Sequence, residues 1–258
     1  MNASRLKIFT FVFFLLVSCL GQTPSASQTT PVENILQRYE QVLGGEDAVR
    51  KISSLTAEGV FALPNIAVQG TIRTYSKAPN KTLAMLRENE NGPFLTLGFN
   101  GQKAWQQRSA DSLIFTREIH GPALAQMRLN AEFYREIKLR ELYPKLHWRG
   151  QAQIADETAD VIAAEAATGS TEKWYFSRST GLLLCREALA LDDTGEGMEP
   201  VQSFYADYRA VAGVQIPFES RVVFAQSPER NLILKLQRVT ANLVIPDAKF
   251  ERPLLTNR

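Results

Sequence analysis

The sequence predicts a mainly β protein of the α+β class, built on one large curved antiparallel sheet. Three observations predict this fold. Hydrophobic residues recur at helical spacing between residues 31 and 52. From residue 54 to residue 243 they mostly alternate with polar residues, as they do in strands that bury one face. One helical segment, residues 120–143, interrupts this alternation.

The first 18 residues have the pattern of an export signal. Arg5 and Lys7 precede residues 8–17, a run that is apolar except for one threonine. As a helix this run is about 15 Å long, half of the ~30 Å hydrocarbon core of a bilayer. The length is therefore typical of a secretory signal rather than a transmembrane helix.

The signal ends in Leu-Val-Ser-Cys at residues 16–19, which resembles the lipobox of bacterial lipoproteins. In such proteins the cysteine receives a diacylglyceryl group and becomes the first residue after cleavage. We therefore expect residues 1–18 to be a lipoprotein signal peptide and Cys19 to carry acyl chains such as palmitate. A plain secretory signal with an incidental cysteine is the alternative interpretation.

A lipidated Cys19 would anchor the protein firmly, because each buried methylene contributes about 0.8 kcal/mol. Leu20 follows the cysteine, where an aspartate would resemble an inner-membrane retention signal. The expected location is therefore the bacterial cell envelope, on the outer membrane facing the periplasm. Residues 19–30 are small and polar, which predicts a lipidated cysteine followed by a flexible tether.

Residues 31–255 are expected to form a single domain that starts with two helices. Pro31 suits the first position of a helix over residues 31–43, and Gly44-Gly45 ends it. A second, short helix is expected at residues 46–52. No linker rich in proline or glycine interrupts the rest of the domain.

About ten or eleven strands are expected in the sheet. Turn signals such as Asn100-Gly101 separate the first strands, and Pro144 ends the helical interruption. A sheet of this size must curl to bury its apolar face. The prediction is an unclosed half-barrel with the N-terminal and mid-chain helices packed in its mouth. The later strands are expected at residues 147–154, 161–167, 173–178, 182–190, 198–211, 214–224 and 231–243.

Composition excludes several classes of function. The chain has 29 Lys and Arg against 27 Asp and Glu, so its charge does not indicate nucleic acid as a partner. Its two histidines, His120 and His147, and two cysteines cannot supply a disulfide scaffold or a zinc cluster. We expect Cys185, within an apolar run, to be buried and inert.

Motifs for catalysis are also absent from the sequence. It has no G-x-S-x-G elbow, no H-x-x-x-H, no C-x-x-C and no phosphate-binding loop. Asp192, Asp193, Glu196 and Glu199 form an acidic cluster, interpreted as a solvated loop, with weak calcium binding as the alternative. We therefore expect no enzymatic activity and no cofactor.

Large apolar residues on the predicted strands have two interpretations. They form the core of the sheet, or they line an apolar cleft for a lipid or acyl ligand, because a half-barrel does not fill its own interior. Strand residues 95, 97 and 99 share one face, and two residues of the mid-chain helix would cover them. The candidate cleft residues are Leu95, Leu97, Phe99, Trp105, Leu124, Met127, Trp174 and Phe176.

Several short segments between residues 32 and 253 resemble, in order and spacing, the LolA/LolB-like family of outer-membrane lipoprotein-sorting proteins. The resemblance implies an unclosed β-barrel with helices in its mouth and a cleft that accepts acyl chains. The segments are LGG at 43–45, SLTAEG at 54–59, YSKAPNK at 75–81, FNGQKAW at 99–105, WYF at 174–176, TGLL at 180–183, DYR at 207–209, GVQIP at 213–217 and FERP at 250–253.

Two functions remain open at this point. The first is a membrane-anchored envelope lipoprotein that binds a lipid or the acyl moiety of lipoproteins, in sorting to the outer membrane. The second is an envelope sensor or assembly subunit that binds a protein partner and uses the same fold without lipid transfer. A hydrolase is a distant third, because it would require convergent titratable groups in the cleft.

Overall fold

The computed structural model describes residues 31–110, 113–192 and 197–253. The expected signal peptide, Cys19 and the tether lie outside the described residues, as do Asp193 and Glu196 of the acidic cluster. Within the described part of the chain, no helix is both long and apolar enough to cross a bilayer.

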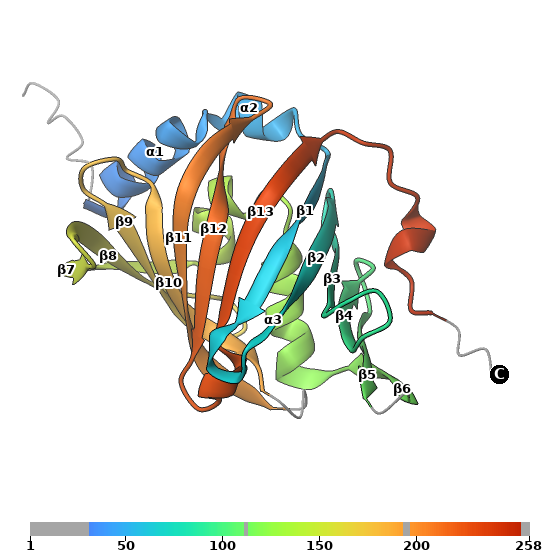
Figure 1. Cartoon of the computed structure of the whole chain (residues 1–258). Helices are drawn as coiled ribbons and strands as arrows, with labels where there is room; N and C mark the ends of the chain where they lie inside the picture. Colours follow the sequence, from blue (N-terminus) through green and yellow to red (C-terminus); the bar gives the residue numbers. More distant parts are fainter. Residues whose placement is uncertain (1–30, 111–112, 193–196, 254–258) are drawn as a thin grey trace, which may run out of the picture. The chain divides into compact units, whose positions relative to one another are not determined.

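The described strands form one antiparallel sheet of thirteen strands, in the order β6-β5-β4-β3-β2-β1-β13-β12-β11-β10-β9-β8-β7. The two end strands, β6 (Leu113–Ile119) and β7 (Lys145–Ile154), do not pair with each other. The sheet therefore curves without closing, and Figure 1 shows helices on its concave side. This confirms the predicted unclosed half-barrel.

The structure has more strands than the ten or eleven expected. Strand β6 was missed because Leu113, Ile114 and Phe115 are all exposed, so they show no alternation of buried and exposed residues. The remaining strands are β1 (Ser54–Leu63), β2 (Val68–Lys77), β3 (Lys81–Arg87), β4 (Phe94–Phe99), β5 (Ala104–Ala110), β8 (Glu157–Glu165), β9 (Thr171–Ser177), β10 (Leu183–Leu191), β11 (Met198–Val211), β12 (Val214–Phe224) and β13 (Leu232–Ala241).

The helices lie near their predicted positions. Helix α1 (Pro31–Leu43) ends at Gly44, whose φ of 122° is favourable for glycine. Helix α2 (Glu46–Arg50) follows it. The interruption between β6 and β7 contains α3 (Gly121–Ala131), α4 (Leu139–Leu142) and the short 3-10 helix η2 (Arg135–Ile137).

The largest core cluster lies between α1, α4 and strands β8–β10. Leu36, Tyr39 and Leu43 of α1 are buried against Trp174 and Phe176 of β9. The rings of Tyr39 and Phe176 are 5.0 Å apart between centroids. Helix α1 thus covers one end of the concave face, where its apolar stripe was expected to pack.

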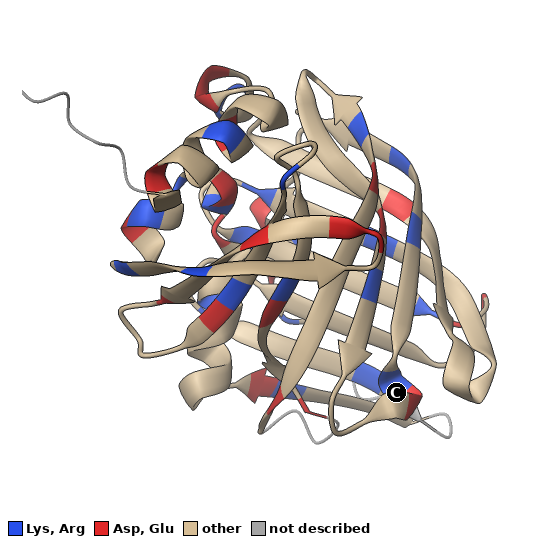
Figure 2. Ribbon diagram, turned by 90° about the vertical axis from the view of Figure 1, so that its left-hand side faces the viewer, with Lys and Arg blue, Asp and Glu red and all other residues tan. Residues whose placement is uncertain are grey.

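The outer face of β2–β5 is covered by the C-terminal segment. The 3-10 helix η4 (Asp247–Phe250) packs there, and Lys77 and Lys81 both pair with Asp247 at 2.8 Å. These two lysines lower the pKa of Asp247 to about 2. Along the ribbon in Figure 2, acidic and basic residues are interspersed, as the balanced composition predicts.

Candidate functional site

On the concave side of the sheet, the described residues line a space near each end of β12. We name the space beside α2 and the start of β12 the upper cavity, and the space beside the end of β12 the lower hollow. The upper cavity has a volume of about 200 Å³ and the lower hollow about 420 Å³. The curved sheet therefore leaves apolar room that its own side chains do not fill.

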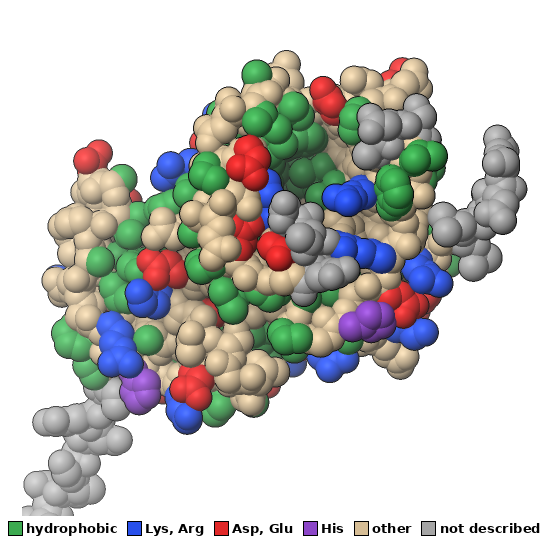
Figure 3. All heavy atoms as spheres, turned by 90° about the horizontal axis from the view of Figure 1, so that it is seen from below, with side chains coloured by type: hydrophobic (Ala, Val, Ile, Leu, Met, Phe, Trp, Pro, Cys, Tyr) green, Lys and Arg blue, Asp and Glu red, His purple; other side chains and the backbone are tan. Residues whose placement is uncertain are grey.

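The lower hollow is formed by strands from both halves of the sheet. Seen from below, Figure 3 shows a recess with hydrophobic side chains inside and charged side chains at its border. Its polar lining residues are Glu88, Gln106, Arg108, Ser109, Asp192 and Arg230. Its apolar lining residues are Phe61, Leu63, Val68, Leu86, Pro93, Phe94, Leu95, Phe224 and Leu232.

The upper cavity lies between the helices and the ends of β1, β11 and β12. Burial raises the pKa of Tyr39 and Tyr208, so both phenols stay neutral, and the Tyr208 hydroxyl donates to the Leu183 carbonyl at 2.8 Å. The residues that line the cavity are Tyr39, Leu43, Val49, Ile52, Leu55, Phe133, Arg135, Glu136, Leu183, Tyr205, Tyr208, Val214, Gln215, Ile216 and Pro217.

The structure brings four candidate cleft residues together. Leu97 and Phe99 of β4 lie in one cluster with Leu124 and Met127 of α3, the arrangement expected from strand parity. Phe99 is completely buried there, so it is part of the packed core. Leu95, on the same face of β4, lines the lower hollow instead.

Trp105 lies on the opposite face of the sheet and does not join the other candidates. Phe99 pairs with Ala104 across the hairpin, so the next residue, Trp105, must point outward. Its indole covers Gly98, and its Nε1 donates to the carbonyl oxygen of Phe250 at 3.0 Å. The expectation that Trp105 lines the concave cleft is corrected by this register.

Trp174 and Phe176 are on the concave face but line neither the upper cavity nor the lower hollow. They are 1% and 2% exposed, and their rings stack with centroids 6.3 Å apart. The space beside them is only about 10 Å³. The structure therefore places both in the core, the first of the two interpretations given to these aromatic residues.

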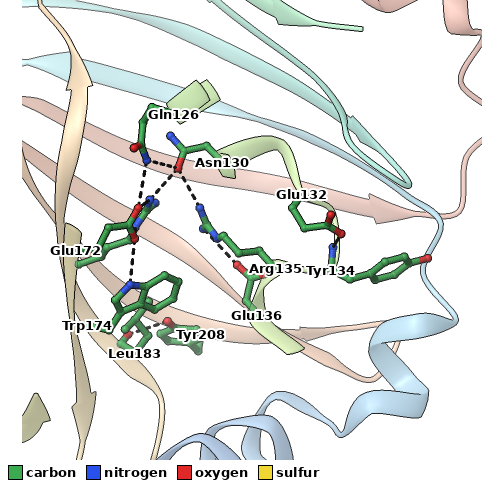
Figure 4. Close-up of polar contacts among 11 residues, drawn as sticks. Gln126, Asn130, Glu132, Tyr134, Arg135, Glu136, Glu172, Trp174, Leu183 and Tyr208 are labelled. Atoms are coloured by element: carbon green, nitrogen blue, oxygen red, sulfur yellow. Dashed lines mark hydrogen bonds and ion pairs between the residues drawn. The ribbon is translucent and has the colours of Figure 1, made fainter. Parts of the chain in front are cut away.

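A buried polar network fills the concave interior between α3 and β9–β10 (Figure 4). Glu172 accepts hydrogen bonds from Arg186, from the Trp174 indole at 3.0 Å and from Gln126 at 3.2 Å. Arg186 also donates to Asn130 at 2.7 Å. Because Gln126 and Asn130 belong to α3, the network attaches this helix to the sheet.

Electrostatics keep this network ionised. Burial alone would raise the pKa of Glu172, but the hydrogen bonds and charge of Arg186, then Arg135, outweigh it and lower that pKa. Every oxygen of the carboxylate already accepts a hydrogen bond, so it is not available as a general base. The network is a structural clamp rather than a catalytic group.

The other polar candidates are also accounted for. His147 is exposed on β7, and His120 precedes α3 without a side-chain capping bond. Glu199 is buried and binds Arg230 at 2.5 Å, which corrects its assignment to a solvated loop.

Cys185 is buried as expected, and burial raises its pKa to about 12. Among the described residues, no cluster of His, Cys, Asp or Glu could hold a metal ion.

Sequence reasoning missed most of the residues that line the lower hollow. Phe61, Leu86 and Leu232 lie on three different strands, and only the sheet order places them near Leu95. The sequence did carry a signal for them, since each is an apolar residue at an alternating strand position. Residues paired across neighbouring strands share a face, as Leu86 and Leu95 do.

No family model matches this sequence, and no curated protein matches it significantly. Solved structures do resemble it. A DUF1329 family protein from Desulfovibrio piger has a TM-score of 0.55 at 15% identity, over 86% of this chain and 98% of that one. A LolA superfamily protein from Nitrosomonas europaea has a TM-score of 0.54 at 13% identity, over 87% and 99%.

A third solved structure is an outer-membrane lipoprotein-sorting protein domain from Vibrio parahaemolyticus. It has a TM-score of 0.52 at 10% identity, over 84% of this chain and 94% of that one. These likenesses show that the chain has the LolA-like fold. None of the three descriptions names an enzymatic activity.

Proposed function

We propose that this protein is a non-enzymatic envelope lipoprotein that binds the acyl chain of a lipid or of another lipoprotein in the lower hollow. The observation that carries the proposal is the hollow itself. Apolar side chains from β1, β3, β4, β12 and β13 converge on one space of about 420 Å³. That volume lies within the range of about 300–1,000 Å³ that is usual for ligand sites.

The lower hollow suits an amphiphile better than the upper cavity does. The upper cavity is about half as large, and its lining includes the helix residues Tyr39, Leu43 and Val49. The hollow has charged residues beside its apolar lining, among them Glu88 and Arg108. An acyl chain can therefore be buried while its polar end stays near water.

Lipidation of Cys19 is part of the proposal. The lipobox-like residues 16–19 and the polar segment after them support a body tethered to the outer membrane, facing the periplasm. In that position, the protein would receive or hold acyl chains next to the bilayer that they leave or enter. The LolA-like fold supports a role in lipoprotein sorting as part of this proposal.

A second candidate function is the binding of an envelope protein by the edge strand β6. Leu113, Ile114 and Phe115 are 62%, 54% and 50% exposed on this edge. An apolar edge strand is a template for pairing with another strand, because its backbone groups lack a partner on one side. The other edge, β7, is protected by a bulge between Trp148 and Gln151.

The test uses the full mature protein and a neutral monoacylglycerol, measured by displacement of a neutral, environment-sensitive dye. Leu95→Trp fills the lower hollow and should weaken binding at least about tenfold, a loss of about 1.4 kcal/mol. Val60→Trp places the same ring on the half-exposed outer side of β1 and should leave affinity unchanged. Val214→Trp fills the upper cavity.

The outcomes separate the candidates. Loss of affinity in Leu95→Trp alone supports the lower hollow, whereas loss in Val214→Trp alone would move the site to the upper cavity. Two results together would overturn the acyl-binding proposal in favour of the second candidate. The wild-type protein would take up no lipid, and it would bind an envelope protein in stoichiometric amount that Phe115→Glu no longer binds.

A further inference from the structure

A groove on the neighbouring edge of the sheet adjoins the lower hollow. The groove is lined by Gln106 and Arg108 of β5 and by Ile114, Phe115, Thr116 and Arg117 of β6, and its volume is about 410 Å³. Gln106 and Arg108 line both the groove and the hollow. The polar end of a ligand in the hollow would therefore lie beside a second, more polar space.

Strand register places two arginines on the side of the groove that faces the hollow. Leu95 pairs with Arg108, and Arg108 pairs with Phe115, so the three side chains share one face. Gln106 pairs with Arg117 on the same face. Arg108 and Arg117 are thus diagonal neighbours, with Cα atoms about 7–8 Å apart in such a ladder.

The two guanidinium groups differ in their freedom. Arg117 donates from Nε and Nη2 to Oε1 of Gln106 at 3.0 and 2.6 Å, which fixes its orientation. Arg108 is exposed and, within the described part of the chain, has no hydrogen-bond or ion-pair partner. Its donors are available to a ligand.

The other charged residues of the hollow do not neutralise Arg108 directly. Arg230 is bound to Glu199 and to the carbonyl of Leu191. Glu88 follows β3 and Asp192 follows β10, so both acids come from other strands of the lining. The side of the hollow formed by β5 therefore presents the positive charge of Arg108, and the neighbouring groove adds Arg117 of β6.

We propose that Arg108, supported by Arg117, binds the phosphate of an anionic acyl lipid whose chain lies in the lower hollow. This inference rests on the proposed function and adds the chemical class of the headgroup. Arginine suits this task because its planar fork can donate two hydrogen bonds to phosphate oxygens. The apolar groove residue Phe115, on the same face as Arg108, would contact the glycerol end of the lipid.

The experiment compares two amphiphiles that differ only in the phosphate: a lysophosphatidic acid and the monoacylglycerol with the same chain. Binding of each to the full mature protein is measured by calorimetry, with inorganic phosphate as a third ligand. The wild type should prefer the phosphate amphiphile by about tenfold or more. The preference should shrink as salt is raised, because the site is open to solvent.

Arg108→Gln should remove most of this preference, because it should weaken binding of the phosphate amphiphile much more than binding of the neutral one. Arg149→Gln is the matched control, because Arg149 is exposed on the opposite edge strand, β7. Both variants should keep the wild-type unfolding curve.

Equal binding of the two amphiphiles by the wild type would overturn the inference, and so would identical behaviour of Arg108→Gln and Arg149→Gln. Inorganic phosphate that binds as tightly as the phosphate amphiphile would overturn the assignment to a lipid. Binding of the neutral amphiphile tests the proposed function independently. If the neutral amphiphile binds as well as the phosphate amphiphile, only the assignment of a phosphate headgroup is refuted. If neither amphiphile binds, both proposals are refuted.

Discussion

Arg186 of β10 donates two hydrogen bonds to Glu172 of β9, from Nε to Oε2 at 2.6 Å and from Nη2 to Oε1 at 2.5 Å. The two side chains are 9% and 0% exposed. The pair lies in the concave interior, where Gln126 of α3 donates to the same carboxylate. Its geometry therefore fixes both the register of two strands and the position of the helix.

Glu172→Gln should destabilise the protein by about 3–5 kcal/mol, because it leaves the Arg186 charge buried without its counterion. The double variant Glu172→Leu with Arg186→Leu should be much closer to wild type, since neither buried charge remains. Urea unfolding followed by circular dichroism measures both. Equal stability of Glu172→Gln and the double variant would show that the charge pair is not the source of the effect.

The same pair predicts how stability depends on pH. The pKa of Glu172 is lower in the folded state than in the unfolded chain, so its contribution is complete above the unfolded value of about 4.3 and is lost as pH falls toward the folded value. Between pH 6 and pH 3, the wild type should lose more unfolding free energy than the double leucine variant. Parallel pH profiles of the two proteins would contradict this assignment.

Trp105 predicts a role for the C-terminal segment in stability. Trp105→Phe removes the indole hydrogen bond to the carbonyl of Phe250 and leaves that buried acceptor unpaired, which costs about 1–3 kcal/mol. Trp148→Phe is the control, because Trp148 is 45% exposed and should change stability by less than about 0.5 kcal/mol. Thermal unfolding of the two variants tests the difference.

Local signals were sufficient to predict much of the fold. Pro31 and Gly44-Gly45 bound α1 where they were expected to, and Asn100-Gly101 forms the hairpin between β4 and β5. Strand β6 was missed because Leu113 to Phe115 are exposed on a sheet edge, so burial does not impose alternation there. The bounds of α1 and the hairpin at Asn100-Gly101 could be predicted because helix propensity and turn chemistry depend on only a few neighbouring residues.

The site was harder to predict because it depends on pairing between distant segments. Leu95 was named from strand parity, but its neighbours in the hollow include Phe224 and Leu232, more than a hundred residues away. Glu172 and Gln126 are buried polar partners, and no periodic pattern marks such residues. Trp105 could have been placed correctly, since the hairpin register alone sets it opposite to Phe99.

The two cysteines make the proposed lipid anchor measurable by thiol chemistry. Burial raises the pKa of Cys185 to about 12, so at pH 8 it is almost entirely an unreactive thiol in the folded protein. If Cys19 is acylated, the mature native protein should not react with iodoacetamide, and the denatured protein should react at one cysteine only. The Cys185→Ala variant should then remain unlabelled after denaturation.

Metabolic labelling with a palmitate analogue tests the anchor directly. The wild-type protein and Cys185→Ala should both incorporate the label and fractionate with membranes, because Cys185→Ala leaves the lipobox intact. Cys19→Ala should lose the label, since no acyl chain can be attached at this position. A labelled Cys19→Ala protein would place the acyl group elsewhere, and an unlabelled wild type would favour the plain secretory signal.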